Sequence, residues 1–158
     1  MAVQNKIGLG ILGAANIARK NIQSIKLLEN IVIVAIGSRD ITKAQAMIEE
    51  MEINDAAHAY ASYEEVLNDP RVDAVYIPLP SALHVKWVEH AAAAGKHILL
   101  EKPIAVSPTD SAAIIEAVNT NNVQLMDGTM FMHNRRTEKM ESVLKSGALG
   151  SIKEVTST

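Results

Sequence analysis

The stretch KIGLGILGAANIARK, residues 6–20, joins an apolar run to a helical segment through a glycine-rich turn. Gly8, Gly10 and Gly13 match the dinucleotide-binding fingerprint G-x-G-x-x-G letter for letter. In that register the strand before the first glycine would be AVQNK, residues 2–6, which is too polar for a central strand of a parallel sheet. The fingerprint needs its first glycine at the end of a buried strand, so we reject this register.

A second register begins at Gly13 and places Ala15 and Ala18 at the later glycine positions. Residues 7–12 then form the buried strand, and the helix that follows directs its N-terminal amide groups at a pyrophosphate. The predicted cofactor-binding residues of this turn are Gly13, Ala14, Ala15, Asn16 and Ile17. The alternative is a tight strand-to-helix turn that holds no ligand.

Apolar, β-branched runs alternate with segments of helical period along most of the chain. The predicted strands are residues 7–12, 31–36, 57–60, 74–77, 97–100 and 123–126. Helix starts lie between them: Ser62 with Glu65 has the pattern of a capping box, and Ser107 precedes Pro108. This alternation predicts an α/β fold with a doubly wound parallel sheet, the Rossmann NAD(P)-binding fold.

The second predicted strand ends in Ser38 and Arg39, where an NAD-preferring fold places a carboxylate for the ribose 2′-hydroxyl. A hydroxyl and a guanidinium suit a 2′-phosphate instead, because the arginine forms charge-assisted hydrogen bonds that a carboxylate would oppose. The pair therefore favours NADP over NAD. The alternative is that Ser38 and Asp40 only cap the next helix while Arg39 is solvated.

Composition narrows the class of protein. The 158 residues are enough for one domain with a sizeable core, and no apolar run approaches the length of a membrane span. A net charge of -3 with interspersed signs argues against a nucleic-acid partner. The chain lacks cysteine and an N-terminal export signal, which favours a cytoplasmic location. Five histidines without ligand spacing predict no metal site.

The stretch VDAVYIPLPSALHVKWVEHAAAAGKHILLEKPIA, residues 72–105, combines a strand ending in Pro78 and Pro80, a helical His84 and the triplet Glu101–Pro103. With the glycine turn and the serine–arginine pair, these motifs resemble the Gfo/Idh/MocA oxidoreductases. The likeness continues through VQLMDGTMFMHNRRT. Within the family, the sequence is most similar to the NADP-dependent dihydrodiol dehydrogenase and D-xylose dehydrogenase branch, including its plant-type members.

The resemblance implies that the lysine of the EKP motif, Lys102, lies beside the nicotinamide and the substrate hydroxyl, and that His84 lies near the nicotinamide ribose or the substrate. Independently, Lys102 follows a predicted strand at the carboxyl edge where open α/β sheets bind ligands, and its ammonium can polarise a carbonyl. We predict Lys102 and His84 as catalytic residues. The further predicted cofactor-binding residues are Pro78, Leu79, Pro80, His84, Glu101 and Lys102. An exposed loop lysine and a solvated first-turn histidine are the alternatives.

We expect a Rossmann domain over residues 1–127. Over 128–158 we expect a linker, a helix over residues 137–145 and the first strand of a truncated substrate domain, starting in SIKEVTST. Met132 and Arg135 depart from the residues that many family members have there. The predicted function is hydride transfer between NADP and a sugar-like, diol or carbonyl small molecule, in a homodimer or larger assembly with no membrane partner. The alternatives are a standalone dinucleotide-binding scaffold and a non-redox isomerase or cyclase.

Overall fold

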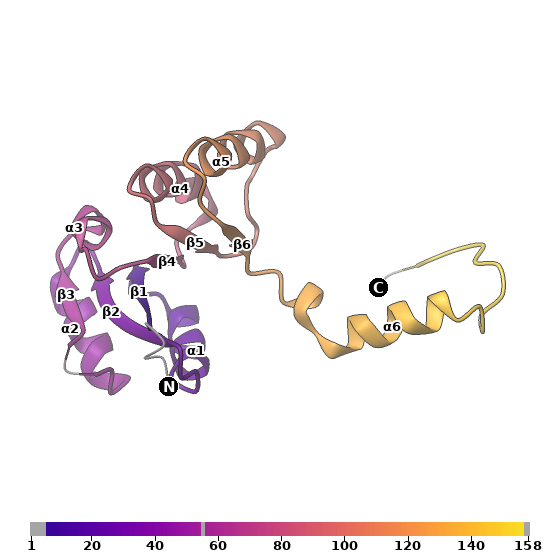
Figure 1. Cartoon of the computed structure of the whole chain (residues 1–158), viewed down its shortest axis with the longest axis horizontal. Coiled ribbons are helices and arrows are strands. Elements are labelled where there is room, and N and C mark those ends of the chain that lie inside the picture. The colour runs from indigo at the N-terminus through magenta and orange to yellow at the C-terminus, as the bar shows by residue number, and fades with distance from the viewer. Residues whose placement is uncertain (1–5, 55, 157–158) are drawn as a thin grey trace. The chain divides into compact units, whose positions relative to one another are not determined.

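The computed structural model describes residues 6–54 and 56–156, and its contacts divide the chain into two compact units after Gly128 (Figure 1). The strands are β1 (Ile7–Leu12), β2 (Ile31–Gly37), β3 (His58–Tyr60), β4 (Ala74–Ile77), β5 (His97–Leu100) and β6 (Leu125–Asp127). The α-helices are α1 (Asn16–Ile25), α2 (Ile41–Glu50), α3 (Tyr63–Asn68), α4 (His84–Ala93), α5 (Pro108–Thr120) and α6 (Arg135–Lys145), with 3₁₀ turns at Ser81–Leu83 and Met130–His133.

The first unit contains one six-stranded sheet with the order β3-β2-β1-β4-β5-β6, and every neighbouring pair is parallel. This order reverses between β1 and β4, which is the topological switch point at which doubly wound sheets bind ligands beyond the carboxyl ends of their strands. The α/β fold predicted from the alternation of strands and helices is therefore confirmed.

Helices cover both faces of this sheet. The buried residues of α1 and α2 pack with one set of strand residues, including Leu9, Ile11 and Tyr76. Those of α3, α4 and α5 pack with a second set, including Val75, Ile77 and Leu100, and α4 lies against α5 (Figure 1). Alternate residues of β4 thus enter different layers, as the period of a strand requires.

Local signals for helix starts are confirmed. Ser62 and Glu65 form a reciprocal capping box at α3, and Ser107 caps α5 by accepting a hydrogen bond from the Asp110 amide. The last strand of the sheet begins two residues later than predicted. Val123 does not join the sheet, because its backbone amide donates a hydrogen bond to the carbonyl of Val118 at the end of α5.

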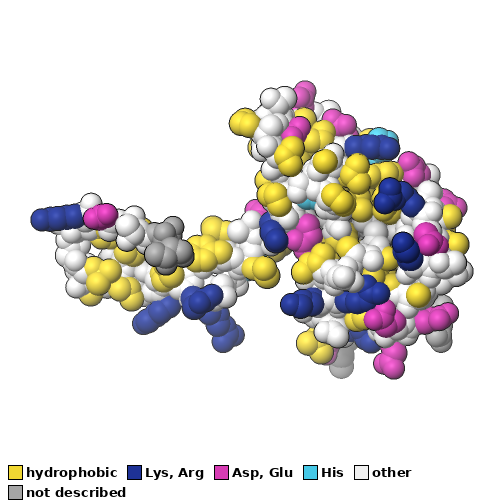
Figure 2. Space-filling view, turned by 180° about the vertical axis from the view of Figure 1, so that it is seen from behind, with side chains coloured by type: hydrophobic (Ala, Val, Ile, Leu, Met, Phe, Trp, Pro, Cys, Tyr) yellow, Lys and Arg dark blue, Asp and Glu magenta, His cyan; other side chains and the backbone are white. Residues whose placement is uncertain are grey.

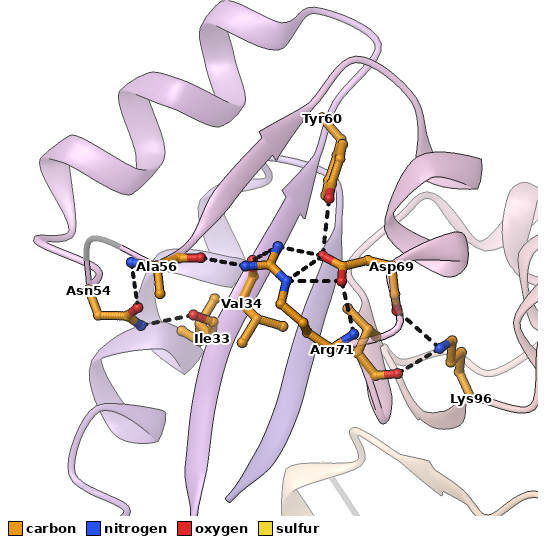
Figure 3. Close-up of polar contacts among 9 residues, drawn as sticks. Ile33, Val34, Asn54, Ala56, Tyr60, Asp69, Arg71 and Lys96 are labelled. Carbon is orange, nitrogen blue, oxygen red and sulfur yellow. Dashed lines mark hydrogen bonds and ion pairs between the residues drawn. The ribbon is translucent and has the colours of Figure 1, made fainter.

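An ion pair between a buried carboxylate and an exposed guanidinium stabilises the loop between α3 and β4 (Figure 3). The Asp69 carboxylate, whose side chain is only 2% exposed, accepts hydrogen bonds from the Arg71 guanidinium and the Tyr60 hydroxyl. Arg71 also donates to the carbonyl groups of Ala56 and Val34. These bonds join the α3–β4 loop to β2 and to the segment before β3.

The second unit contains the 3₁₀ turn Met130–His133 and α6, which begins two residues before the predicted 137–145. The strand predicted from Ser151 is absent: residues 151–156 have no regular secondary structure, and 157–158 lie outside the described residues. A strand needs a neighbour for its backbone hydrogen bonds, and no described segment pairs with this one. Hydrophobic side chains are exposed on this unit (Figure 2), among them Met130, Phe131, Met132, Met140 and Leu144.

Candidate dinucleotide-binding site

The turn between β1 and α1 has the backbone that the second glycine register predicts. Gly13 follows the last residue of β1 and has φ of +117°, in the left-handed region that favours glycine. A Cβ at Gly13 would lie 3.0 Å from the Cδ2 atom of Leu79. Gly8 lies inside β1, where a Cβ would lie 1.8 Å from the carbonyl oxygen of Arg71. The two glycines therefore serve different purposes: Gly13 makes the turn, whereas Gly8 allows close packing in the strand.

The start of α1 presents free amide groups at this turn. Ala15 is the N-cap residue and makes no side-chain capping bond, so the first amides of the helix have no partner from a cap. Asn16 and Ile17 are exposed there, and the Asn16 side-chain oxygen accepts a hydrogen bond from Arg19. An unpaired helix N-terminus beside a glycine turn can bind the phosphate groups of a dinucleotide.

A cleft of about 450 Å³ opens beside the turn at the carboxyl edge of the sheet. Its lining brings three predicted segments together with further residues: Gly13, Ala14, Ala15, Ser38, Arg39, Asp40, Lys43, Tyr63, Pro78, Leu79 and Pro80. Asn16, Ile17, His84, Glu101 and Lys102 are not among the lining residues. The cleft thus covers the side of the switch point that faces β2.

Two cations face this cleft at the end of β2. Arg39 is exposed and has no hydrogen-bond or ion-pair partner among the residues that the structure describes. Lys43, in the first turn of α2, also lines the cleft and was not predicted; because Arg39 precedes this helix, helical spacing gave no signal that the two side chains face one cleft. The cleft therefore concentrates positive charge where a ribose 2′-phosphate would need it.

The polar residues between β2 and α2 have separate roles. Asp40 caps α2 by accepting hydrogen bonds from the amide and hydroxyl of Thr42, and these bonds hold the pKa of Asp40 below its usual value. Ser38 does not cap the helix: it is buried, and its hydroxyl accepts a hydrogen bond from the Asp40 amide. The capping alternative is thus right for Asp40 and wrong for Ser38.

The EKP motif follows β5 at the same edge of the sheet. The Glu101 carboxylate accepts hydrogen bonds from the Tyr76 hydroxyl at 2.6 Å and from the Lys102 amide at 3.2 Å. The Lys102 side chain is exposed, and the Lys102–Pro103 peptide bond is cis. Sequence reasoning missed Tyr76, although a hydroxyl in a strand as apolar as β4 signals a buried polar partner.

His84 is enclosed between two loops of the fold. It is fully buried at the start of α4, so the solvated alternative is wrong. Its Nε2 atom lies 2.9 Å from the Leu79 carbonyl oxygen, and its Nδ1 atom lies 3.1 Å from the Ile104 carbonyl oxygen. A direct contact with a nicotinamide or a substrate would require one of these bonds to break. The geometry instead joins the loop after β4 to the loop after β5.

The site thus consists of a glycine turn, a helix N-terminus, paired cations and an acid–lysine motif along one edge of a doubly wound sheet. A model of the Gfo/Idh/MocA group, described as "Oxidoreductase family, NAD-binding Rossmann fold", matches residues 7–129. The chain belongs to this family. No helix within residues 6–54 and 56–156 combines the length and the apolar character that a membrane crossing requires.

Several relatives of this chain are named for an enzymatic activity. D-xylose 1-dehydrogenase (NADP(+)) 2 from Haloferax volcanii is 39% identical over 148 residues, which cover 94% of this chain and 44% of that protein. The dTDP-3,4-didehydro-2,6-dideoxy-alpha-D-glucose 3-reductase of Saccharopolyspora spinosa is 31% identical over 155 residues, covering 98% of this chain and 46% of that protein. The chain therefore spans less than half the length of these Gfo/Idh/MocA relatives.

Solved structures of the family agree with this assignment. A mutant of KijD10, a 3-ketoreductase from Actinomadura kijaniata in complex with TDP-benzene and NADP, superimposes with a TM-score of 0.86. It is 29% identical, and the match covers 94% of this chain and 46% of KijD10. The structure of KijD10 with NADP alone gives a TM-score of 0.85 at 30% identity.

Proposed function

We propose that this chain is the NADP-binding part of an oxidoreductase that transfers hydride between the nicotinamide and a sugar-like, diol or carbonyl substrate. The observation that carries the proposal is that two cations, Arg39 just after β2 and Lys43 in the first turn of α2, line the same cleft. Asp40 is the one carboxylate among the described residues that line the cleft, and it is engaged by Thr42. A 2′-phosphate would meet two cations there, while the Asp40 carboxylate is held in the helix cap by Thr42.

The residues fit a dinucleotide across the switch point. Gly13 leaves free the volume that a Cβ would fill, so a pyrophosphate can approach the backbone and the amides of α1. Arg39, Lys43 and Ser38 would hold the 2′-phosphate end. The Pro78–Pro80 loop would line the middle of the cleft, and Glu101 and Lys102 would lie toward the nicotinamide half, over β4 and β5.

NADP supplies or accepts the hydride when it is bound. The residues of this chain would then supply a proton to the substrate oxygen and a positive charge that stabilises the negative charge developing on it. The Lys102 ammonium is exposed at the carboxyl edge of β5, where it can donate a hydrogen bond to a carbonyl oxygen and pass it a proton. The Glu101 carboxylate accepts a hydrogen bond from the Lys102 backbone amide and so lies beside the backbone that carries this side chain.

The sugar-related activities for which the relatives are named support a sugar-like substrate. We further propose that the chain belongs to the dihydrodiol and D-xylose dehydrogenase branch of the family, with its plant-type members. We also propose a cytoplasmic protein that self-associates through exposed apolar side chains such as Phe131 and Met132. Size-exclusion chromatography with light scattering tests the self-association. A molecular mass equal to that of the monomer at all protein concentrations would contradict it.

Titration with NADPH and NADH, followed by nicotinamide fluorescence, tests the cofactor. We expect tight binding of NADPH and weaker binding of NADH, and equal affinities would contradict the 2′-phosphate assignment.

NADPH oxidation with a panel of sugars and ketones tests the reaction. Lys102→Ala should lower the rate by about 10²-fold or more while leaving NADPH affinity nearly unchanged, because general acid catalysis contributes at least this much. A rate that is unchanged in Lys102→Ala would contradict the role proposed for Lys102.

A further inference from the structure

The Glu101 carboxylate is held by side chains from two other elements of the fold. The Tyr76 hydroxyl, on β4, donates a 2.6 Å hydrogen bond to Oε1 of Glu101. The Asn21 side-chain amide, on α1, donates a 2.6 Å hydrogen bond to that same hydroxyl and lies 3.5 Å from Oε1. Residues from α1, β4 and the end of β5 therefore meet at one carboxylate oxygen.

The surroundings of Tyr76 keep its hydroxyl protonated and able to donate a hydrogen bond to Glu101. Tyr76 is 1% exposed. It lies in the apolar layer between α1 and the sheet, with Ile22 of α1 and Ile11 of β1. Burial, and then the bond to Glu101, raise the pKa of Tyr76 far above its usual value, so the hydroxyl stays protonated at any physiological pH. Since its oxygen already accepts from Asn21, its proton has one direction in which to point.

The second oxygen of Glu101 is also restrained. Oε2 accepts the hydrogen bond from the Lys102 amide. Gly128, just after β6, packs against the same group: a Cβ there would lie 3.2 Å from the Leu100 carbonyl oxygen and 3.6 Å from Oε2. The carboxylate is thus fixed at both ends, yet Glu101 remains partly exposed at the edge of the sheet.

We propose that Tyr76 and Asn21 are positioning residues that fix the Glu101 carboxylate as an acceptor for the nicotinamide half of the cofactor. The inference rests on the proposed function. The chain order reverses between β1 and β4, so a dinucleotide with its 2′-phosphate at Arg39 directs its other half over β4 and β5. That half carries ribose hydroxyl and carboxamide donors, for which an oriented carboxylate is the complementary group.

The test compares two ligands of the same chain. NADPH reaches both halves of the cleft, whereas 2′,5′-ADP carries only the phosphate end. Tyr76→Phe should weaken NADPH binding about tenfold, as expected for one hydrogen bond to a charged group, and leave 2′,5′-ADP binding unchanged. Tyr60→Phe is the matched control, since it removes another tyrosine hydroxyl, half-buried, that donates to a carboxylate, Asp69, away from the cleft. It should change neither affinity.

A double-mutant cycle separates positioning from a general loss of packing. If Tyr76 acts through Glu101, Tyr76→Phe should have no further effect on NADPH binding in a Glu101→Ala background, because alanine leaves no acceptor for the hydroxyl. Asn21→Ala keeps the test decisive if Tyr76→Phe folds poorly: Asn21 is only half-buried, and its loss should weaken NADPH, and not 2′,5′-ADP, by about threefold.

Equal losses for both ligands, additive effects in the cycle, or unchanged NADPH binding in both variants would overturn the inference. The wild-type titration distinguishes this from failure of the proposed function. A wild-type chain that binds neither ligand overturns the proposed function and the inference with it, whereas normal wild-type binding with an unaffected Tyr76→Phe variant overturns the inference alone.

Discussion

The Arg71 guanidinium forms a 2.6 Å ion pair with the buried carboxylate of Asp69 (Figure 3). Asp69 is the acceptor for three groups around it: the Arg71 side chain, the Arg71 amide and the Tyr60 hydroxyl. These bonds, chiefly those from the Arg71 side chain, lower the pKa of Asp69 to about 2. The ion pair lies near the start of β4, at the opposite end of that strand from the cleft, so it concerns stability.

This pair predicts an acid-sensitive contribution to folding. Because the pKa of Asp69 is lower in the folded chain than its ordinary value of 3.8, the contribution is complete above that value and is lost as pH falls toward about 2. A shift of this size corresponds to about 2 kcal/mol. Asp69→Asn should lower the free energy of unfolding by about this amount at neutral pH and flatten its fall between pH 4 and 2, as measured by urea titration. A variant with the wild-type pH profile would contradict the assignment.

The two glycines of the first strand and turn should fail in different ways. Gly13→Val forces a β-branched residue into a left-handed conformation at the cleft, and should abolish NADPH binding while the chain remains folded. Gly8→Ala places a methyl group against the Arg71 carbonyl and should destabilise the fold by about 3 kcal/mol or more. Circular dichroism and calorimetric titration measure both effects. The reverse pattern would restore the rejected register.

The paired cations should read the 2′-phosphate. Arg39→Ala should remove about 1.5–3 kcal/mol of NADPH binding, as expected for a charge-assisted contact, and leave NADH nearly unaffected. Lys43→Ala should act in the same direction with a smaller loss. Lys139→Ala, which removes an exposed charge from α6, controls for net charge and should change neither titration. Equal losses for NADPH and NADH would show that these cations do not contact the 2′-phosphate.

His84 distinguishes a positioning role from a catalytic one. His84→Ala removes the buried ring that lies against the Leu79 and Ile104 carbonyl oxygens and takes a hydrogen-bond donor from one of them, so it should destabilise the fold by about 2–3 kcal/mol. NADPH binding should weaken as well, because Leu79 lines the cleft. His90→Ala, at an exposed position of the same helix, is the control. Lost turnover with unchanged stability and affinity would instead support the predicted catalytic contact.

The sequence by itself determined the order of strands and helices and the end of the first strand. Apolar period, capping boxes and the polarity of residues 2–6 are local properties, and they were sufficient to place Gly13 at the turn. The same reasoning brought Ser38, Arg39 and the EKP motif to the carboxyl edge, because all parallel strands end on that edge.

Only the tertiary structure decided which side chains meet there. Asn21, Tyr76 and Glu101 come from separate elements, and their contact depends on how α1 packs on the sheet and on the pairing of β4 with β5. The burial of His84 likewise depends on two loops that close around it. Sequence periodicity specifies the face on which a residue lies, whereas the partner of a buried polar group is set by distances between elements that are remote in the chain.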